Sequence, residues 1–600
     1  MEEQPLPSDP LLVDKPGEEP LLVDKPGEDP LLVDKPGEDP LLVNKPGKDK
    51  VDREINYTFT LIFSITIAVF GNSFLYGYQI GVVNTPSHII KDFYNATYYE
   101  RRGGNWSNVQ AYASYLEGLN KTIHVSDSNA STTPGPVEKT PADFGADESL
   151  LLEKWELELL WSSTVAAFVL FGMVGAFLAL KVADTVGRKR GMVVITFIMF
   201  LAAILGGITV IAKSPECLIL SRVLVGLHSG LNITLVPLYL TEIAPKKIRG
   251  AVGTCHQLAI TVGILFSQIM GMTELLGTVD LWPLLFAFNA IPSLVCLFVL
   301  PFCPESPRWM LIAKDRVEEA KTAMQKLRGY DNVEDEMDEM KLEAIKAKKS
   351  DKANFTLKDL LTTPELRMPT VIACVGQISQ QWSGINAVMS YSAFIFAQAN
   401  VSATNIPYVI VGTGFVNVVA TIIAVPLMEK LGRRPLLLWP MCVMAGSFVL
   451  MTIFLQLQFD PSMKDNHSTF AMICIILMHL YIVGFALGLG PIPFTIVAEI
   501  FTQESRAAAM SLSVACNWIC NFILMWTFPF LRDGLEAYTY LLFVVILVAA
   551  IIFIFFFVPE TKNKTFEEIA ESITFGGRAH GKRDGLKINE DDSLMGNTKV

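Results

Sequence analysis

The chain has 600 residues, of which 51% are hydrophobic and only 18% are charged. That composition excludes an ordinary soluble protein, although the length alone would allow several globular domains. The net charge of −12 also excludes a simple nucleic-acid-binding protein, because phosphate recognition requires a basic surface. We therefore expect a protein that is embedded in a lipid bilayer and binds no nucleic acid.

The chain begins with a low-complexity segment. The motif Pro10–Glu18 recurs, with small changes, three more times at a spacing of ten residues. Proline and glycine in every copy prevent a helix or a central strand, so we expect residues 1–57 to be a disordered cytoplasmic tail. Leu-Leu pairs after acidic residues suggest a dileucine signal, with sorting machinery as a partner. Gly17 and Gly27 occupy the usual place of the acid, so repeat slippage without function is the competing interpretation.

Twelve apolar stretches of spanning length follow, each with the roughly 20 residues that a bilayer requires. They lie at 58–83, 157–180, 191–212, 216–240, 252–273, 281–302, 369–397, 407–429, 435–457, 470–497, 508–530 and 538–558. Basic residues cluster in segment 303–368 and in short loops on the same side, which places that side and both termini in the cytoplasm. We therefore expect an all-α membrane protein with two six-helix halves, 58–302 and 369–558. A helical cytoplasmic linker, 303–368, joins the halves, and a cytoplasmic tail follows at 559–600.

The loop at 84–156 supports this topology, because it contains four Asn-x-Ser/Thr sequons. Such sequons are glycosylated only outside the cytoplasm. The candidate acceptors are Asn95, Asn105, Asn120 and Asn129. We therefore expect this loop to be extracellular and the protein to be a multi-pass glycoprotein of the plasma membrane.

Short motifs recur at equivalent places in the two halves. Asp184–Arg190 ends the second span and Glu429–Arg434 ends the eighth, while Pro-Glu pairs containing Glu305 and Glu560 follow spans six and twelve. Duplicated halves are typical of transporters that bind their substrate between the halves, near the membrane midplane. A seven-span receptor, or a channel formed by a ring of identical subunits, would not need this symmetry.

The seventh span is rich in amide side chains. Gln377, Gln380 and Gln381 share one helix face by their spacing. Asn386 lies about 140° from Gln381 on an ideal helix and can join that face only if the helix breaks, which Ser383–Gly384 would permit. Neutral amides suit a sugar, which offers hydroxyl groups and no charge. Hydrogen bonding between helices is the alternative role for four amides in one span.

With these motifs the sequence resembles the facilitative glucose transporters, in the sugar porter branch of the major facilitator superfamily. The resemblance covers about residues 58–575, and Gln380–Asn386 together with both Pro-Glu signatures is its most specific part. The first loop, His256–Ile260 and Leu327–Asp331 resemble the liver-and-islet type of that family. We find no nucleotide-binding loop and no catalytic constellation, so we expect no enzyme activity, cofactor or metal.

The resemblance implies further side chains around the sugar, from spans five, eight and eleven: Gln257, Asn417, Asn517 and Trp518. Glycine and proline in the tenth span predict a second broken helix that serves as a gate. There Phe494 stands where the glucose-transporter pattern has Trp, and Ala486 stands where it has Glu. The fructose type of the family also lacks that Trp and Glu. The choice between glucose and fructose therefore stays open.

Ionisable residues cluster at the expected cytoplasmic ends of the spans. The resemblance implies a salt-bridge network between the halves, which closes the cytoplasmic gate. Its members are Arg188, Glu242, Arg249, Glu429, Arg433, Arg434, Glu499 and Arg506. The alternative is charge that only sets the topology of the spans.

We expect the protein to be a uniporter that moves hexose down its gradient by alternating access. Proton-coupled sugar porters that resemble this chain carry an Asp in the first span, where Gln79 stands here. Carboxylates in a membrane cavity mark proton relays, and an amide cannot titrate. A proton-coupled sugar symporter and a nontransporting hexose sensor are the alternatives.

Overall fold

The computed structural model describes residues 57–104, 150–245, 248–349, 357–402, 404–458, 466–562, 564 and 566–574. The predicted repeats of the N-terminal tail and the sequons at Asn105, Asn120 and Asn129 lie outside these residues. Within them every regular element is a helix, which confirms the all-α prediction.

The first half consists of helices that match the first six predicted spans, with α3 added in the predicted first loop. They are α1 (Phe59–Ala68), the π-helix η1 (Val69–Ser73), α2 (Phe74–Gly81), α3 (Ser87–Arg101), α5 (Lys154–Val186), α6 (Arg188–Gly207), α7 (Pro215–Ile243), α8 (Arg249–Met270), α9 (Trp282–Ala287), α10 (Ala290–Val299) and η5 (Leu300–Phe302). The first span is continuous through the π-helical turn η1 and does not separate into two helices.

The second half follows a helical linker. The linker contains α11 (Pro307–Ile312), α12 (Val317–Arg328), α13 (Glu334–Lys349) and α14 (Leu357–Thr362). The second half contains α15 (Pro364–Trp382), α16 (Ile385–Gln398), α17 (Ile406–Leu431), α18 (Arg433–Leu457), α19 (His467–Leu487), α20 (Ile492–Ile500), α21 (Gln503–Leu535), η7 (Glu536–Tyr538) and α22 (Thr539–Phe557), and α23 (Phe566–Thr574) follows it.

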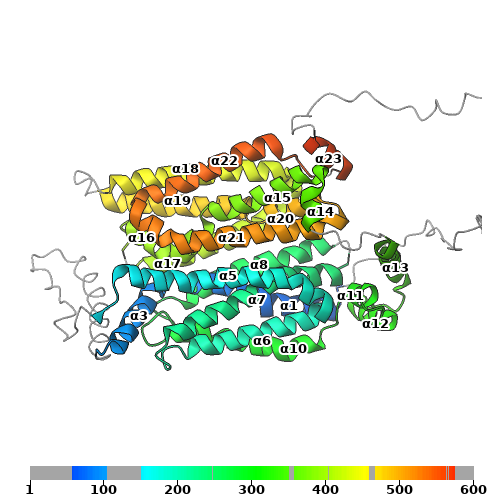
Figure 1. The fold of residues 1–600 in the computed structure, drawn as a ribbon, viewed down its shortest axis with the longest axis horizontal. Coiled ribbons are helices and arrows are strands. Elements are labelled where there is room, and N and C mark those ends of the chain that lie inside the picture. Colours follow the sequence, from blue (N-terminus) through cyan, green and yellow to red (C-terminus); the bar gives the residue numbers. More distant parts are fainter. Residues whose placement is uncertain are drawn as a thin grey trace, which may run out of the picture. The chain divides into compact units, whose positions relative to one another are not determined.

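The long helices of both halves run along a common direction, which gives the bundle two ends (Figure 1). We call the end where α6 and α18 begin, near α11, α12 and α13, the linker end. We call the opposite end, where α5 begins and α21 ends, the loop end. The two halves meet mainly where α5 packs against α21 and α8 packs against α17.

Two spans of the second half are interrupted where glycine predicted a break. In the seventh span α15 ends at Trp382, and Gly384 takes a φ of +94°, which only glycine adopts readily, before α16 begins. In the tenth span α19 ends at Leu487 and α20 begins at Ile492. Both predicted breaks are therefore confirmed.

Ten segments of the described residues are long and apolar enough to span a membrane. One of them, Ala508–Phe557, contains both α21 and α22, which are two predicted spans. The seventh predicted span is missing from the ten because its break leaves two shorter helices and its amides lower its apolar character. The twelve predicted spans thus remain compatible with ten apolar segments.

Candidate functional site

Asn517 of α21 is the centre of a buried amide cluster. Its Nδ2 donates to the Oε1 atoms of Gln377, at 2.8 Å, and Gln380, at 2.6 Å. Its Oδ1 accepts from Nε2 of Gln381 at 2.9 Å. All four side chains are buried, and the three glutamines lie on one side of α15, as their spacing predicts. The structure therefore joins spans seven and eleven through neutral hydrogen-bonding groups.

Both helix interruptions contact this amide cluster. Nδ2 of Asn386, in the first turn of α16, donates to Oε1 of Gln381 at 2.5 Å. The break thus brings Asn386 back to the shared face, as predicted. Nε2 of Gln380 donates to the backbone carbonyls of Leu489, at 2.7 Å, and Gly490, at 2.9 Å, which lie between α19 and α20. One glutamine therefore connects the cluster to the interrupted backbone of the tenth span.

Two buried donors, one in the cluster and one on the residue after Asn517, have no hydrogen-bond partner among the described residues. They are Nε2 of Gln377 and the indole Nε1 of Trp518. Trp518 lies edge-on to Phe168 of α5 in the other half, with ring centroids 6.3 Å apart. An unpaired buried donor costs roughly 1–3 kcal/mol, so both donors favour a ligand or water that offers acceptors at this position.

The other predicted site residues lie outside this network. Gln257 is half-buried on α8, and Asn417 is buried on α17. Among the described residues, neither amide hydrogen-bonds to the cluster. Phe494 is half-buried on α20, where it packs on the main hydrophobic core. The cluster itself is therefore built by spans seven and eleven alone.

Arg222 of α7 is a buried charge that the sequence analysis did not assign to the site. Its NH1 donates to the side-chain oxygen of Gln79 at 3.0 Å and to the carbonyl of that residue at 3.1 Å. Its guanidinium lies 4.6 Å from the ring centroid of Phe168. The only available sequence signal was an arginine within a predicted span. The amide of Gln79 thus occupies a place beside a fixed positive charge.

At the linker end of the first half, Arg188 pairs with Glu242 at 2.9 Å, and both side chains are nearly buried. Oε1 of Glu305 accepts from the backbone amides of Arg188, at 3.1 Å, and Lys189, at 2.8 Å. These amides begin α6, where a carboxylate is favoured by the helix dipole. Glu305, which the sequence showed only as part of a motif, is therefore a helix cap.

The second half repeats this arrangement. Arg433 pairs with Glu499 at 2.8 Å. Glu560 accepts from the backbone amides of Arg433, at 2.9 Å, and Arg434, at 3.1 Å, at the start of α18. Gly187 and Gly432 precede the two capped helices with φ of +101° and +91°, so the same glycine turn is used twice.

These ion pairs differ in one respect from the predicted network between the halves. Arg188–Glu242 and Arg433–Glu499 each lie within one half, because each arginine begins a helix beside the last turn of a neighbour in the same half. Arg506 donates to the carbonyl of Phe501 at 3.3 Å, also within its half. The side chains of Arg249 and Glu429 lie outside the described residues.

At the loop end, hydrogen bonds cross from one half to the other. The side chain of Asn84, after α2, bonds to Ser392 at 2.5 Å and to the amide of Ala393 at 3.2 Å, both on α16. The hydroxyl of Tyr408 on α17 donates to Glu274, after α8, at 2.8 Å. In this structure the two halves are therefore joined at the loop end.

Of the four predicted acceptors in the first loop, Asn95 is the one within the described residues; it lies on helix α3, and its side-chain oxygen is buried. The sequence analysis had placed it in a loop. Its use as a glycan acceptor would require this part of α3 to be extended and accessible when the sugar chain is attached.

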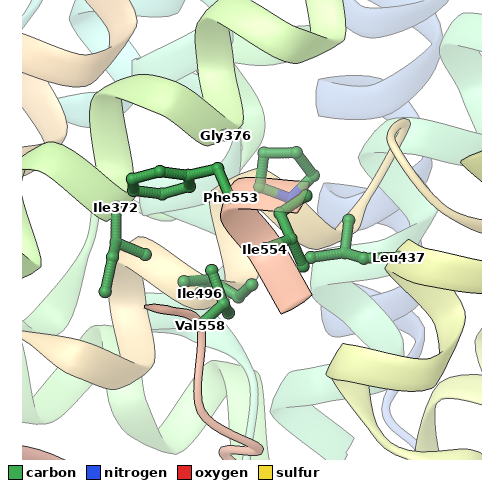
Figure 2. Close-up of a pocket in the computed structure, with 8 residues that line it drawn as sticks. Ile372, Gly376, Leu437, Ile496, Phe553, Ile554 and Val558 are labelled. Atoms are coloured by element: carbon green, nitrogen blue, oxygen red, sulfur yellow. The ribbon is translucent and has the colours of Figure 1, made fainter. Parts of the chain in front are cut away.

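Figure 2 shows a small apolar recess with a volume of about 10 Å³. It lies among α15, α18, α20 and α22 and the residue after α22, and its lining consists of Ile372, Gly376, Leu437, Pro493, Ile496, Phe553, Ile554 and Val558. None of these side chains can donate or accept a hydrogen bond, so the recess does not suit a polar ligand. The amide cluster remains the candidate site.

Comparison with known proteins gives a consistent family assignment. A family model described as "Sugar (and other) transporter" matches residues 64–573. The chain is 40% identical to "Solute carrier family 2, facilitated glucose transporter member 3" of Ovis aries, over 86% of this chain and 93% of that protein. It is 36% identical to the member 5 protein of Equus caballus, over 90% of this chain and 97% of that protein.

Solved structures support the same fold. The proton:xylose symporter XylE bound to 6-bromo-6-deoxy-D-glucose matches with a TM-score of 0.63 and 22% identity, over 86% of this chain and 100% of that chain. An inward-open XylE structure from E. coli matches with a TM-score of 0.62 and 21% identity, over 85% and 99% of the two chains. These likenesses identify the twelve-helix major facilitator fold.

Proposed function

Since this chain belongs to the sugar transporter family, we propose that it is a facilitative uniporter that carries a hexose across the plasma membrane by alternating access. Relatives named as facilitated glucose transporters, which match nearly the whole chain, support the hexose. The same relatives support passive transport, whereas the structural likeness to a symporter extends to the fold alone.

The observation that carries this proposal is the amide cluster with its two unpaired donors. The cluster offers amide oxygens and nitrogens and no charge, which matches a ligand made of hydroxyl groups. When a sugar binds, its hydroxyl groups would take the place of Asn517 as hydrogen-bond partners of the glutamines, so the number of hydrogen bonds would be kept. Trp518 and Phe494 would then supply the aromatic surface on which a sugar ring packs.

Gln79 supports uniport over proton coupling. A carboxylate at this place would pair with Arg222 and could exchange a proton, whereas the amide only accepts a hydrogen bond from the guanidinium. Neither of the side chains that contact the guanidinium of Arg222, Gln79 and Phe168, is a carboxylate, and the titratable group nearby is the phenol of Tyr94. We therefore propose that uptake does not depend on a proton gradient.

We further propose that the linker end faces the cytosol and the loop end faces the cell exterior. Arginine and lysine concentrate at the linker end, which favours a cytoplasmic location. The cross-half bonds of Asn84 and Tyr408 would then close the exterior side, so this structure represents a state that does not admit sugar from outside.

The decisive experiment is uptake of labelled glucose and labelled fructose into proteoliposomes, with and without an imposed proton gradient. We expect one or both sugars to equilibrate without accumulation and the gradient to have no effect. Accumulation that a protonophore abolishes would establish the symporter alternative. Binding without any uptake would establish the sensor alternative.

A matched pair of variants tests the site in the same assay. Gln381→Leu removes a member of the cluster, and Gln398→Leu makes the same change at the loop end of α16. We expect Gln381→Leu to weaken sugar affinity about two- to tenfold, because one hydrogen bond contributes roughly 0.5–1.5 kcal/mol. Equal affinity in both variants would place the site elsewhere.

A further inference from the structure

Five charged side chains gather at the loop end, and the proposed sugar site uses none of them. The first half contributes Lys91 from α3 together with Lys154 and Glu158 from α5, and the second half contributes Arg532 and Asp533 from the last turn of α21. We call these five residues the outer charge cluster. Lys154 and Glu158 are four residues apart and so lie on one face of α5, the helix that packs against α21.

The five charges of the outer charge cluster alternate between positive and negative along one series of contacts. Oε1 of Glu158 lies 2.6 Å from Nζ of Lys91 and 3.5 Å from a guanidinium nitrogen of Arg532. Arg532 donates to Oδ1 of Asp533 at 2.6 Å and 2.8 Å. Oδ2 of Asp533 lies 3.0 Å from Nζ of Lys154. The contacts Glu158–Arg532 and Lys154–Asp533 therefore join the two halves.

The centre of the cluster is buried, whereas its edge is exposed. The side chains of Glu158 and Arg532 are 11% and 7% exposed, and that of Lys154 is 80% exposed. The guanidinium of Arg532 also lies 3.9 Å from the ring centroid of Phe394. A buried charge without its partner is strongly unfavourable. When the halves separate, Glu158 keeps Lys91 and Arg532 keeps Asp533, so the attraction that is lost is that of Glu158–Arg532 and Lys154–Asp533.

Ion pairs suit a contact that must open and close repeatedly. When the halves separate, carboxylate and guanidinium regain water, which offsets much of the lost attraction. An apolar seal of the same area would instead expose hydrophobic surface to water at each opening. Oε2 of Glu158 also has no hydrogen-bond partner among the described residues, so a single oxygen receives both cations.

On the basis of the transport function and orientation inferred above, we propose that the outer charge cluster is the latch that holds the exterior gate shut. Glu158 and Arg532 form its centre. The latch stabilises the state in which the loop end is closed, and it must open before sugar can enter from outside. Weakening it shifts the protein towards the outward-open state.

Another ion pair at the same end provides a matched control. Arg101 pairs with Glu216 at 2.5 Å, but this contact joins α3 to α7 within the first half. Its side chains are 42% and 54% exposed, and exposed pairs contribute little to stability. Arg101→Gln therefore removes a loop-end ion pair without touching the boundary between the halves.

Labelling of a buried cysteine reports whether the exterior gate is open. Gln268 on α8 is buried against Gly414 of α17, between the halves, so a cysteine introduced by Gln268→Cys is reached only when the loop end opens. All variants carry Cys217→Ser, because Cys217 lies near the loop-end start of α7. The probe is a membrane-impermeant maleimide applied outside intact cells that express the full chain.

We expect Glu158→Gln to raise the labelling rate roughly three- to tenfold, which is the effect of a coupling of about 0.7–1.4 kcal/mol. The apparent KM for sugar outside the cell should fall, because a larger fraction of the protein is in the outward-open state that binds this sugar. Asp533→Asn, at the more exposed edge, should have a smaller effect in the same direction, and Arg101→Gln should have none.

Unchanged labelling in Glu158→Gln and Asp533→Asn would overturn the latch, and so would an equal increase in Arg101→Gln. If Glu158→Gln fails to reach the cell surface, the labelling rate of Asp533→Asn decides whether the latch exists. A failure of the proposed function would appear differently, since labelling would respond as expected while neither glucose nor fructose entered the cells.

Discussion

The two halves of this molecule are alike at the linker end and different in the membrane interior. At the linker end each half has an Arg–Glu pair, a glycine with positive φ and a carboxylate that caps the next helix. In the interior, the second half has a neutral amide cluster and two interrupted spans. The first half has a buried guanidinium beside an amide and an uninterrupted fourth span.

This difference indicates which parts of a duplicated fold are free to diverge. Holding helix ends together is the same task in both halves, so the same solution serves twice. Binding an asymmetric ligand between the halves is a single task, and nothing requires both halves to perform it equally. The four predictions below, ordered by expected effect, test whether the interior is as asymmetric as the structure indicates.

Asn517→Leu should have the largest effect, because it leaves the buried amides of Gln377, Gln380 and Gln381 without their shared partner. Each unpaired group costs roughly 1–3 kcal/mol, so we expect sugar uptake to be lost and thermal stability in detergent to fall. The first-half comparison is Ser73→Ala, which removes one bond to His256. Equal losses in both variants would show that the two halves contribute alike.

Gly384→Ala should impair the interruption of the seventh span. An L-residue at this left-handed φ costs roughly 1–2 kcal/mol, and the new Cβ would lie 2.9 Å from the ring of Phe543. We expect reduced uptake and a lower unfolding temperature. Gly446→Ala on α18 is the control, since a Cβ there meets open space. If both variants behave alike, the break does not depend on glycine.

Gln79→Leu should destabilise the first half by about 1.5–3 kcal/mol, because Arg222 loses a hydrogen bond to a buried charge. The measurement is thermal unfolding in detergent. Gln79→Glu, which supplies a countercharge, should be at least as stable as the unmodified protein. Greater stability of the leucine variant would mean that this amide does not support the guanidinium.

Glu305→Gln and Glu560→Gln should have the smallest effects, about 0.3–1 kcal/mol each, because each removes one charge from a helix start. The repeated geometry predicts that the two losses are similar. Unfolding midpoints of the two variants, measured side by side, check this. A large loss of stability in only one of the two variants would show that the halves share a backbone geometry but not the energetic contribution of the capping carboxylate.

Local sequence was sufficient for features that depend on near neighbours in the chain. Helix periodicity placed three glutamines on one face, and Ser383–Gly384 marked the break that returns Asn386 to them. Apolar length located the spans. The turns at Gly187 and Gly432 were not predicted, because the motifs that contain them were recognised only as repeats.

Contacts between distant spans could not be derived in this way. Nothing in the local pattern around Gln380 shows that its amide bonds to the carbonyls of Leu489 and Gly490. The partners of Arg188 and Arg433 also depend on which helix end packs beside them. The resemblance therefore implied a network between the halves at the linker end, whereas the Arg188–Glu242 and Arg433–Glu499 pairs each lie within one half.

The position of Gln380 gives the cluster a second role. Its oxygen accepts from Asn517, and its nitrogen holds the carbonyls of Leu489 and Gly490. A ligand that recruits this side chain releases the interrupted backbone, and a backbone that moves away releases the side chain to the ligand. Occupancy and helix geometry are then thermodynamically linked, and by reciprocity each biases the other by the same free energy.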